Sequence, residues 1–148
     1  TSSLALLAPA WCAAVGAPAA WALVREAVLA VGLDSARRRG RAFGMAALVA
    51  GAAVSLSRQW NPWGELAAWA VSTRVEARIA ALEVFRGFAA LAISGGPIGR
   101  RLEPRLVTFL ASAARACGDP IPSVRSAAAA LCEEIPRALS GSGARVSV

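Results

Sequence analysis

The chain has 148 residues, 57% of them hydrophobic, and its formal net charge of +7 rests on 16 arginines, because lysine and histidine are absent. This length suits one domain with its own core. Without histidine or lysine, Ser-His-Asp and Cys-His catalytic arrangements, Schiff-base chemistry and a phosphate-binding P-loop are excluded. We therefore expect a protein without enzymatic activity, cofactor or metal.

The composition favours helices throughout. Alanine supplies most of the hydrophobic excess, and alanine is the best helix former and lets helices approach closely. No segment alternates polar and apolar residues in the manner of a strand. The sequence therefore predicts an all-α fold.

The first segment, residues 4–24, carries no charge over 21 positions, which is the length of a membrane span. Pro9, Gly16 and Pro18 interrupt it, and proline removes a backbone hydrogen bond from a helix. These breaks favour two short helices, of which the second runs over about residues 18–33.

Asp34 and Ser35 signal the start of the next helix. Residues 42–56 of this helix are nearly apolar all round, so they are buried either in protein or in lipid. Asn61, Pro62 and Gly64 then form a break.

Three of the four helices predicted beyond this break precede Asp119. They are a short one at 65–71, a long one that Ser72 and Thr73 cap and that ends at Ser94, and a third over 102–117 that Gly118 ends. The basic segment at 94–101 is interpreted as a loop, because it lacks the lysine of a P-loop and follows no strand.

The last predicted helix starts after the turn at Asp119 and Pro120 and ends near Pro136. Its apolar residues recur at intervals of four, three and four, which places them on one helix face. They are Val124, Ala128, Leu131 and Ile135. Residues 140–148, rich in serine and glycine, are predicted to be a flexible tail.

The turn at Asp119 and Pro120, followed by Val124 and Arg125, resembles the start of the second helix of a HEAT repeat. Similar helix starts occur around residues 34–37 and 72–75, and HEAT units repeat every ~40–47 residues. The resemblance implies that Asp119 and Arg125, which lie six residues apart, take part in a ladder between neighbouring repeats. A generic array of helical hairpins is the alternative, because Glu76 stands where the pattern has arginine.

The resemblance implies stacked antiparallel helix hairpins that form an α-solenoid fragment of about three repeats. The three approximate hairpins lie within a single domain at 1–139. They cover 18–57, 62–94 and 102–139.

An arginine cluster gives the sharpest candidate for a binding site. Arg37, Arg38, Arg39 and Arg41 stand at a helix start, where positive charge opposes the helix dipole. Arg74, Arg78 and Arg125 stand near the starts of the equivalent helices, so the seven arginines are candidates for a basic strip that binds a partner. The alternative interpretation of the cluster is an ordinary solvated first turn.

We therefore expect a scaffold or adaptor that holds an acidic partner surface within a larger complex. A protein partner is favoured over RNA, because no aromatic residues alternate with the arginines. The competing hypothesis is a small integral membrane subunit with spans at 4–24 and 42–56, with Trp60 and Trp63 at the membrane interface and not in the core.

The three cysteines, Cys12, Cys117 and Cys132, form no metal-type cluster. Their odd number argues against a disulfide scaffold. We expect all three to be small buried apolar residues.

Overall fold

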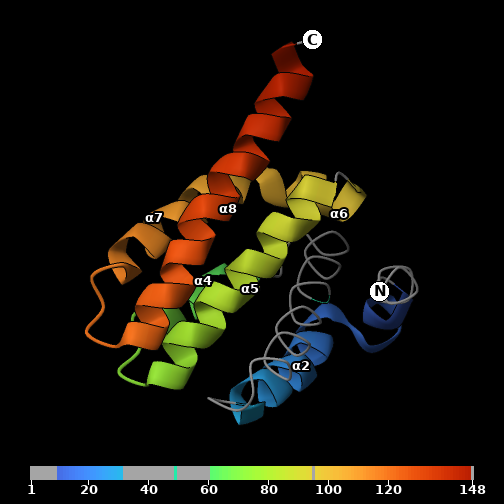
Figure 1. Ribbon diagram of the computed structural model, residues 1–148. Coiled ribbons are helices and arrows are strands. Elements are labelled where there is room, and N and C mark those ends of the chain that lie inside the picture. Colours follow the sequence, from blue (N-terminus) through green and yellow to red (C-terminus); the bar gives the residue numbers. More distant parts are fainter. Residues whose placement is uncertain (1–9, 32–48, 50–60, 95, 148) are drawn as a thin grey trace.

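The computed structural model describes residues 10–31, 49, 61–94 and 96–147. In these ranges the chain forms helices and short turns without any strand (Figure 1), so the predicted all-α class is confirmed. The candidate arginines Arg37, Arg38, Arg39 and Arg41, and most of the apolar segment at 42–56, lie outside the described residues.

The predicted break in the uncharged N-terminal segment is confirmed at Gly16. Residues 10–15 are helical, and Gly16 then takes a φ of 90°, a left-handed conformation that favours glycine. Helix α2 (Ala17–Val31) starts directly after it. No helix among the described residues combines the length and the apolar character needed to cross a membrane.

Helix α4 (Trp63–Ala70) leads through a short turn into α5 (Val75–Ser94). The Oγ of Ser72, which was predicted to cap this helix, accepts the N–H of Arg74 at 3.1 Å within the turn that precedes α5. Helix α5 is the centre of the molecule and is packed against α2, α4, α6, α7 and α8. Its buried residues therefore lie on most of its circumference, as expected for a helix enclosed by others.

The segment after α5 differs from the prediction. The interpretation of 94–101 as a loop was wrong in part, because Pro97 starts helix α6 (Pro97–Leu102). A 3-10 turn, η1 (Glu103–Arg105), then leads into α7 (Leu106–Ala116). Helix α5 ends at Ser94, as predicted, and the fixed φ of proline suits Pro97 to the first position of the next helix.

Helix α8 (Pro122–Ser147) confirms the predicted apolar face, because Val124, Ala128, Leu131 and Ile135 are all completely buried. The predicted end near Pro136 was wrong, since the helix continues through this residue and includes 140–147 of the predicted tail. Proline removes one backbone hydrogen bond, and the remaining bonds continue the helix on both sides of it.

The described helices form two layers. Figure 1 shows α5 and α8 side by side and running in the same direction, with α4 and α7 behind them. Helix α4 also contacts α7, and α2 lies against α5. Trp21 of α2 stacks on Trp69 of α4, with ring centroids 5.8 Å apart. Both rings are buried. Trp60 lies outside the described residues.

Candidate partner-binding surface

Arg78 of α5 joins the turn that precedes α5 to the turn that precedes α8. Its Nε and Nη2 donate to the two carboxylate oxygens of Asp119 at 2.7 and 3.2 Å, and its Nη1 donates to the backbone carbonyl of Ser72 at 2.9 Å. This is the fork-to-fork arrangement in which arginine holds carboxylate most firmly. The side chains are only 14% and 10% exposed, so the pair is an internal structural contact.

Asp119 is held in its charged form by its surroundings. Burial raises the pKa of the carboxyl, but the N–H of Ile121 at 2.9 Å, the hydrogen bond from Arg78 and the charges of Arg78 and Arg125 outweigh it. The net effect is a pKa below the ordinary aspartate value. The turn is therefore closed by an ionised carboxylate at neutral pH.

Of the two residues that the HEAT resemblance implies for a ladder, Asp119 contacts the neighbouring helix pair and Arg125 contacts the turn of its own pair. Arg125 donates from Nη1 to the backbone carbonyl of Asp119 at 2.8 Å. The Asp119 carboxylate pairs instead with Arg78 on the preceding helix pair. Arg125 contacts the turn of Asp119 from the first turn of α8, within the same helix pair. Arg78 reaches Asp119 from α5, so the link between the two helix pairs uses a residue that was expected to bind a partner.

Of the seven predicted binding arginines, the structure leaves two exposed at the starts of neighbouring helices. Arg78 forms an ion pair with Asp119. Arg37, Arg38, Arg39 and Arg41 lie outside the described residues. Arg74 precedes α5 and its side chain is 64% exposed, with Glu76 3.8 Å away. Arg125 is exposed in the first turn of α8. The candidate surface, named here the helix-start surface, consists of Arg74 and Arg125 with the turns that Arg78 joins.

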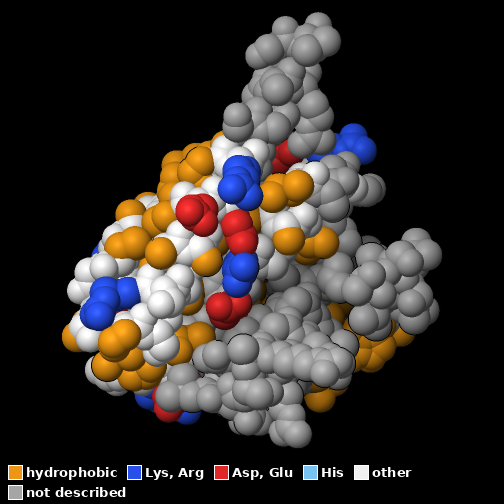
Figure 2. Space-filling model, in the orientation of Figure 1, with side chains coloured by type: hydrophobic (Ala, Val, Ile, Leu, Met, Phe, Trp, Pro, Cys, Tyr) orange, Lys and Arg blue, Asp and Glu red, His pale blue; other side chains and the backbone are white. Residues whose placement is uncertain are grey.

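The opposite signs of charge alternate on the face that Figure 2 displays. Blue and red side chains follow one another across α5 and α8, and the basic groups in this view form no continuous strip. Arg86 of α5 pairs with Glu134 of α8, with Nε 2.9 Å from Oε1, and its Nη1 lies 4.0 Å from Oε2 of Glu83. Positive charge on this face is therefore largely compensated.

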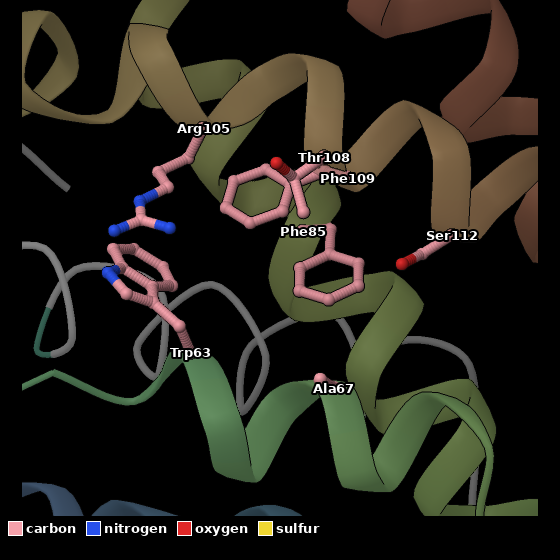
Figure 3. Close-up of a pocket in the computed structure, with 7 residues that line it drawn as sticks. All are labelled: Trp63, Ala67, Phe85, Arg105, Thr108, Phe109 and Ser112. Atoms are coloured by element: carbon pink, nitrogen blue, oxygen red, sulfur yellow. The ribbon is translucent and has the colours of Figure 1, made fainter.

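A second feature, which sequence reasoning missed, is a shallow pocket between α4, α5 and α7. Figure 3 shows the Arg105 guanidinium over the Trp63 ring, and the distance to the ring centroid is 5.0 Å. The pocket measures about 40 Å³, against several hundred Å³ for the usual small-molecule site. It therefore serves packing, with Arg105 covering the rim of the aromatic core by a cation–π contact.

The cysteines also depart from their predicted role. Cys12 is buried, as expected, but Cys117 is exposed and Cys132 is half-buried. The Sγ atoms of these two lie 3.8 Å apart. The spacing of the cysteines in the sequence could not have predicted this contact, because it depends on how α7 packs against α8.

Comparisons with protein-family models, with curated proteins and with solved structures found no match for this chain.

Proposed function

We propose that this protein is a non-enzymatic helical-repeat scaffold, which holds the acidic surface of a protein partner within a larger complex. Two packed helix pairs, α4 with α5 and α7 with α8, support the repeat architecture. Arg86 and Glu134, which join α5 to α8, are 48 residues apart, close to the 49 residues that separate Val75 from Val124. Equivalent positions on successive second helices are therefore neighbours, as in a stacked array.

The observation that carries the proposed binding role is the contrast between Arg78 and its two neighbours at the helix-start surface. Arg78 neutralises Asp119, so the charge of that carboxylate does not oppose an incoming anion. Arg74 and Arg125 keep exposed side chains beside the positive dipole ends of α5 and α8. Guanidinium groups in this setting suit the carboxylates of an acidic protein surface.

A protein partner is favoured over single-stranded RNA. RNA binding of that kind uses aromatic side chains on which bases stack. Residues 72–79 and 119–135, which hold the helix-start surface and the first turns of α5 and α8, contain no aromatic residue.

The test uses fluorescently labelled poly-L-glutamate as the acidic probe and the full chain as the binder. We expect Arg74→Ala with Arg125→Ala to weaken binding about tenfold, and binding of the unaltered chain to weaken steeply with salt. The matched control is Arg100→Ala with Arg101→Ala, which removes the same charge from exposed positions on α6, beyond the other end of α5. The control should change binding less than twofold.

Equal losses in the two double variants would show that only net charge matters and would overturn the helix-start surface. Replacing Arg37, Arg38, Arg39 and Arg41 by alanine in the same assay tests whether that cluster contributes. Tighter binding of labelled poly(U) than of poly-L-glutamate would replace the protein partner by RNA.

A further inference from the structure

Two cysteine side chains meet where the end of α7 packs against α8. Cys117 directly follows α7 and is exposed, and Cys132 lies in α8 and is half-buried. Their sulfur atoms are 3.8 Å apart. Cys12 provides the contrast, because it is buried beside the backbone carbonyl of Val49.

We propose that Cys117 and Cys132 form an intramolecular disulfide when the protein meets a low-molecular-weight disulfide such as oxidised glutathione. The proposal depends on the proximity of two thiols, one of them accessible to a small molecule from solvent. It stands independently of the binding role proposed for the helix-start surface.

The reaction is a pair of thiol–disulfide exchanges. The Cys117 thiolate attacks one sulfur of oxidised glutathione, which forms a mixed disulfide and releases one glutathione thiolate. The Cys132 thiolate then attacks the Cys117 sulfur, which forms the protein disulfide and releases the second glutathione. The two protein thiols lose two protons and two electrons, and one glutathione disulfide is reduced to two thiols.

The position of Cys117 allows the necessary approach. The sulfurs must move from 3.8 Å to the bond length of about 2.0 Å, which requires side-chain rotation and a small backbone adjustment. The N–H of Cys117 is shared between the carbonyls of Ala113 and Ala114, at 3.1 and 3.3 Å. Such shared bonds are common at helix ends, where the chain adjusts more easily than inside a helix.

The disulfide would close a segment of the chain that contains Asp119. The two cysteines are 15 residues apart, and the turn held by Arg78 lies between them. A cross-link over a loop of this length restricts the unfolded chain and so favours the folded one. Oxidation should therefore stabilise the α7–α8 pair.

The test equilibrates the folded full chain with glutathione buffers of defined oxidised-to-reduced ratio, followed by alkylation of free thiols. Trypsin cuts after Arg115, Arg125 and Arg137, so Cys117 falls in peptide 116–125 and Cys132 in peptide 126–137. We expect these two peptides to be linked, Cys12 to be alkylated, and the unalkylated chain to lose about 2 Da. The melting temperature should rise by roughly 5 °C or more.

Two variants sharpen the result. Cys132→Ser should trap glutathione on Cys117 as the mixed disulfide, and Cys12→Ser should leave the link between the two peptides unchanged. The peptide map of the unaltered chain is decisive even where a variant folds poorly. The proposal is overturned if Cys117 and Cys132 both remain alkylated, if glutathione stays on Cys117 in the unaltered chain, or if non-reducing electrophoresis shows dimers in place of the internal link.

Discussion

At the scale of single residues, the strongest polar contact between the helix pairs is Arg78 with Asp119. Arg78 donates two hydrogen bonds to the Asp119 carboxylate, in the turn before α8, and one to the Ser72 carbonyl, in the turn before α5. The side chains of the ion pair are mostly removed from water. The pair of Arg86 with Glu134 also joins α5 to α8, but its side chains are 46% and 28% exposed. Because water screens exposed charges, the two pairs should differ in their contribution to stability.

We expect Asp119→Asn to lower the free energy of unfolding by about 1–3 kcal/mol at pH 7, because Arg78 is left partly buried without its counter-charge. The measurement is urea denaturation followed by circular dichroism. Glu134→Gln is the control at the exposed pair, and its cost should stay below about 1 kcal/mol. A cost for Glu134→Gln equal to that of Asp119→Asn would contradict this ranking.

The stabilising effect of Asp119 should depend on pH, and the Asp119→Asn variant tests this. The pKa of Asp119 is lower in the folded protein than its ordinary value, so the folded state binds the proton less readily than the unfolded state does. Its contribution is present above about pH 4, the ordinary aspartate value, and is lost as the pH falls through the folded pKa. The difference between the unaltered chain and Asp119→Asn should therefore shrink at low pH; an equal difference at pH 7 and pH 3 would rule out this linkage.

At the scale of elements, helix α6 depends on a close approach to α5. A Cβ placed on Gly99 would overlap the backbone carbonyl of Leu91, which is part of α5 and has no freedom to move aside. Gly64 of α4 is the opposite case, since a Cβ there meets nothing within 4 Å. Glycine is thus required at one of these helical positions and replaceable at the other.

We expect Gly99→Ala to destabilise the protein by about 1–3 kcal/mol, as overpacking does in a tight contact. Gly64→Ala should be neutral or stabilise by up to about 1 kcal/mol, because alanine is the better helix former. Thermal denaturation of the two variants gives the comparison. Similar melting temperatures for both would mean that α6 does not pack on α5 as described.

At the scale of the whole molecule, aromatic contacts connect the two helix pairs. Phe109 of α7 stacks on Phe85 of α5, with centroids 4.5 Å apart, and lies 5.7 Å from Trp63 of α4. Leu131 of α8 is completely buried in the same core. The two pairs should therefore unfold together.

We expect Leu131→Ala to cost about 2–5 kcal/mol through the cavity it leaves. All five tryptophans lie at or before Trp69, so their fluorescence reports the N-terminal half, whereas circular dichroism reports every helix. The two signals should shift together in urea for this α8 variant. An unchanged fluorescence transition beside a shifted dichroism transition would show that α7 and α8 unfold separately.

The sequence by itself determined the all-α class and the buried face of α8. The intervals between Val124, Ala128, Leu131 and Ile135 place them on one face by helix geometry alone, and that face is the one in the core. Gly16 breaks the N-terminal helical segment and Ser72 bonds the turn before α5. Both effects depend on neighbouring residues, so they can also be predicted from the sequence. The helix that Pro97 starts and the continuation of α8 through Pro136 were missed, because proline stops one helix and starts or interrupts another depending on its surroundings.

Only the tertiary structure decided the partners of the polar side chains. Arg78 and Asp119 are 41 residues apart, and no local pattern distinguishes this arginine from Arg74, which stays exposed. The meeting of Cys117 with Cys132 likewise depends on the packing of α7 against α8. Helix periodicity is a property of neighbouring residues, whereas such pairings depend on how whole helices dock, so they became visible only when the helices were in place.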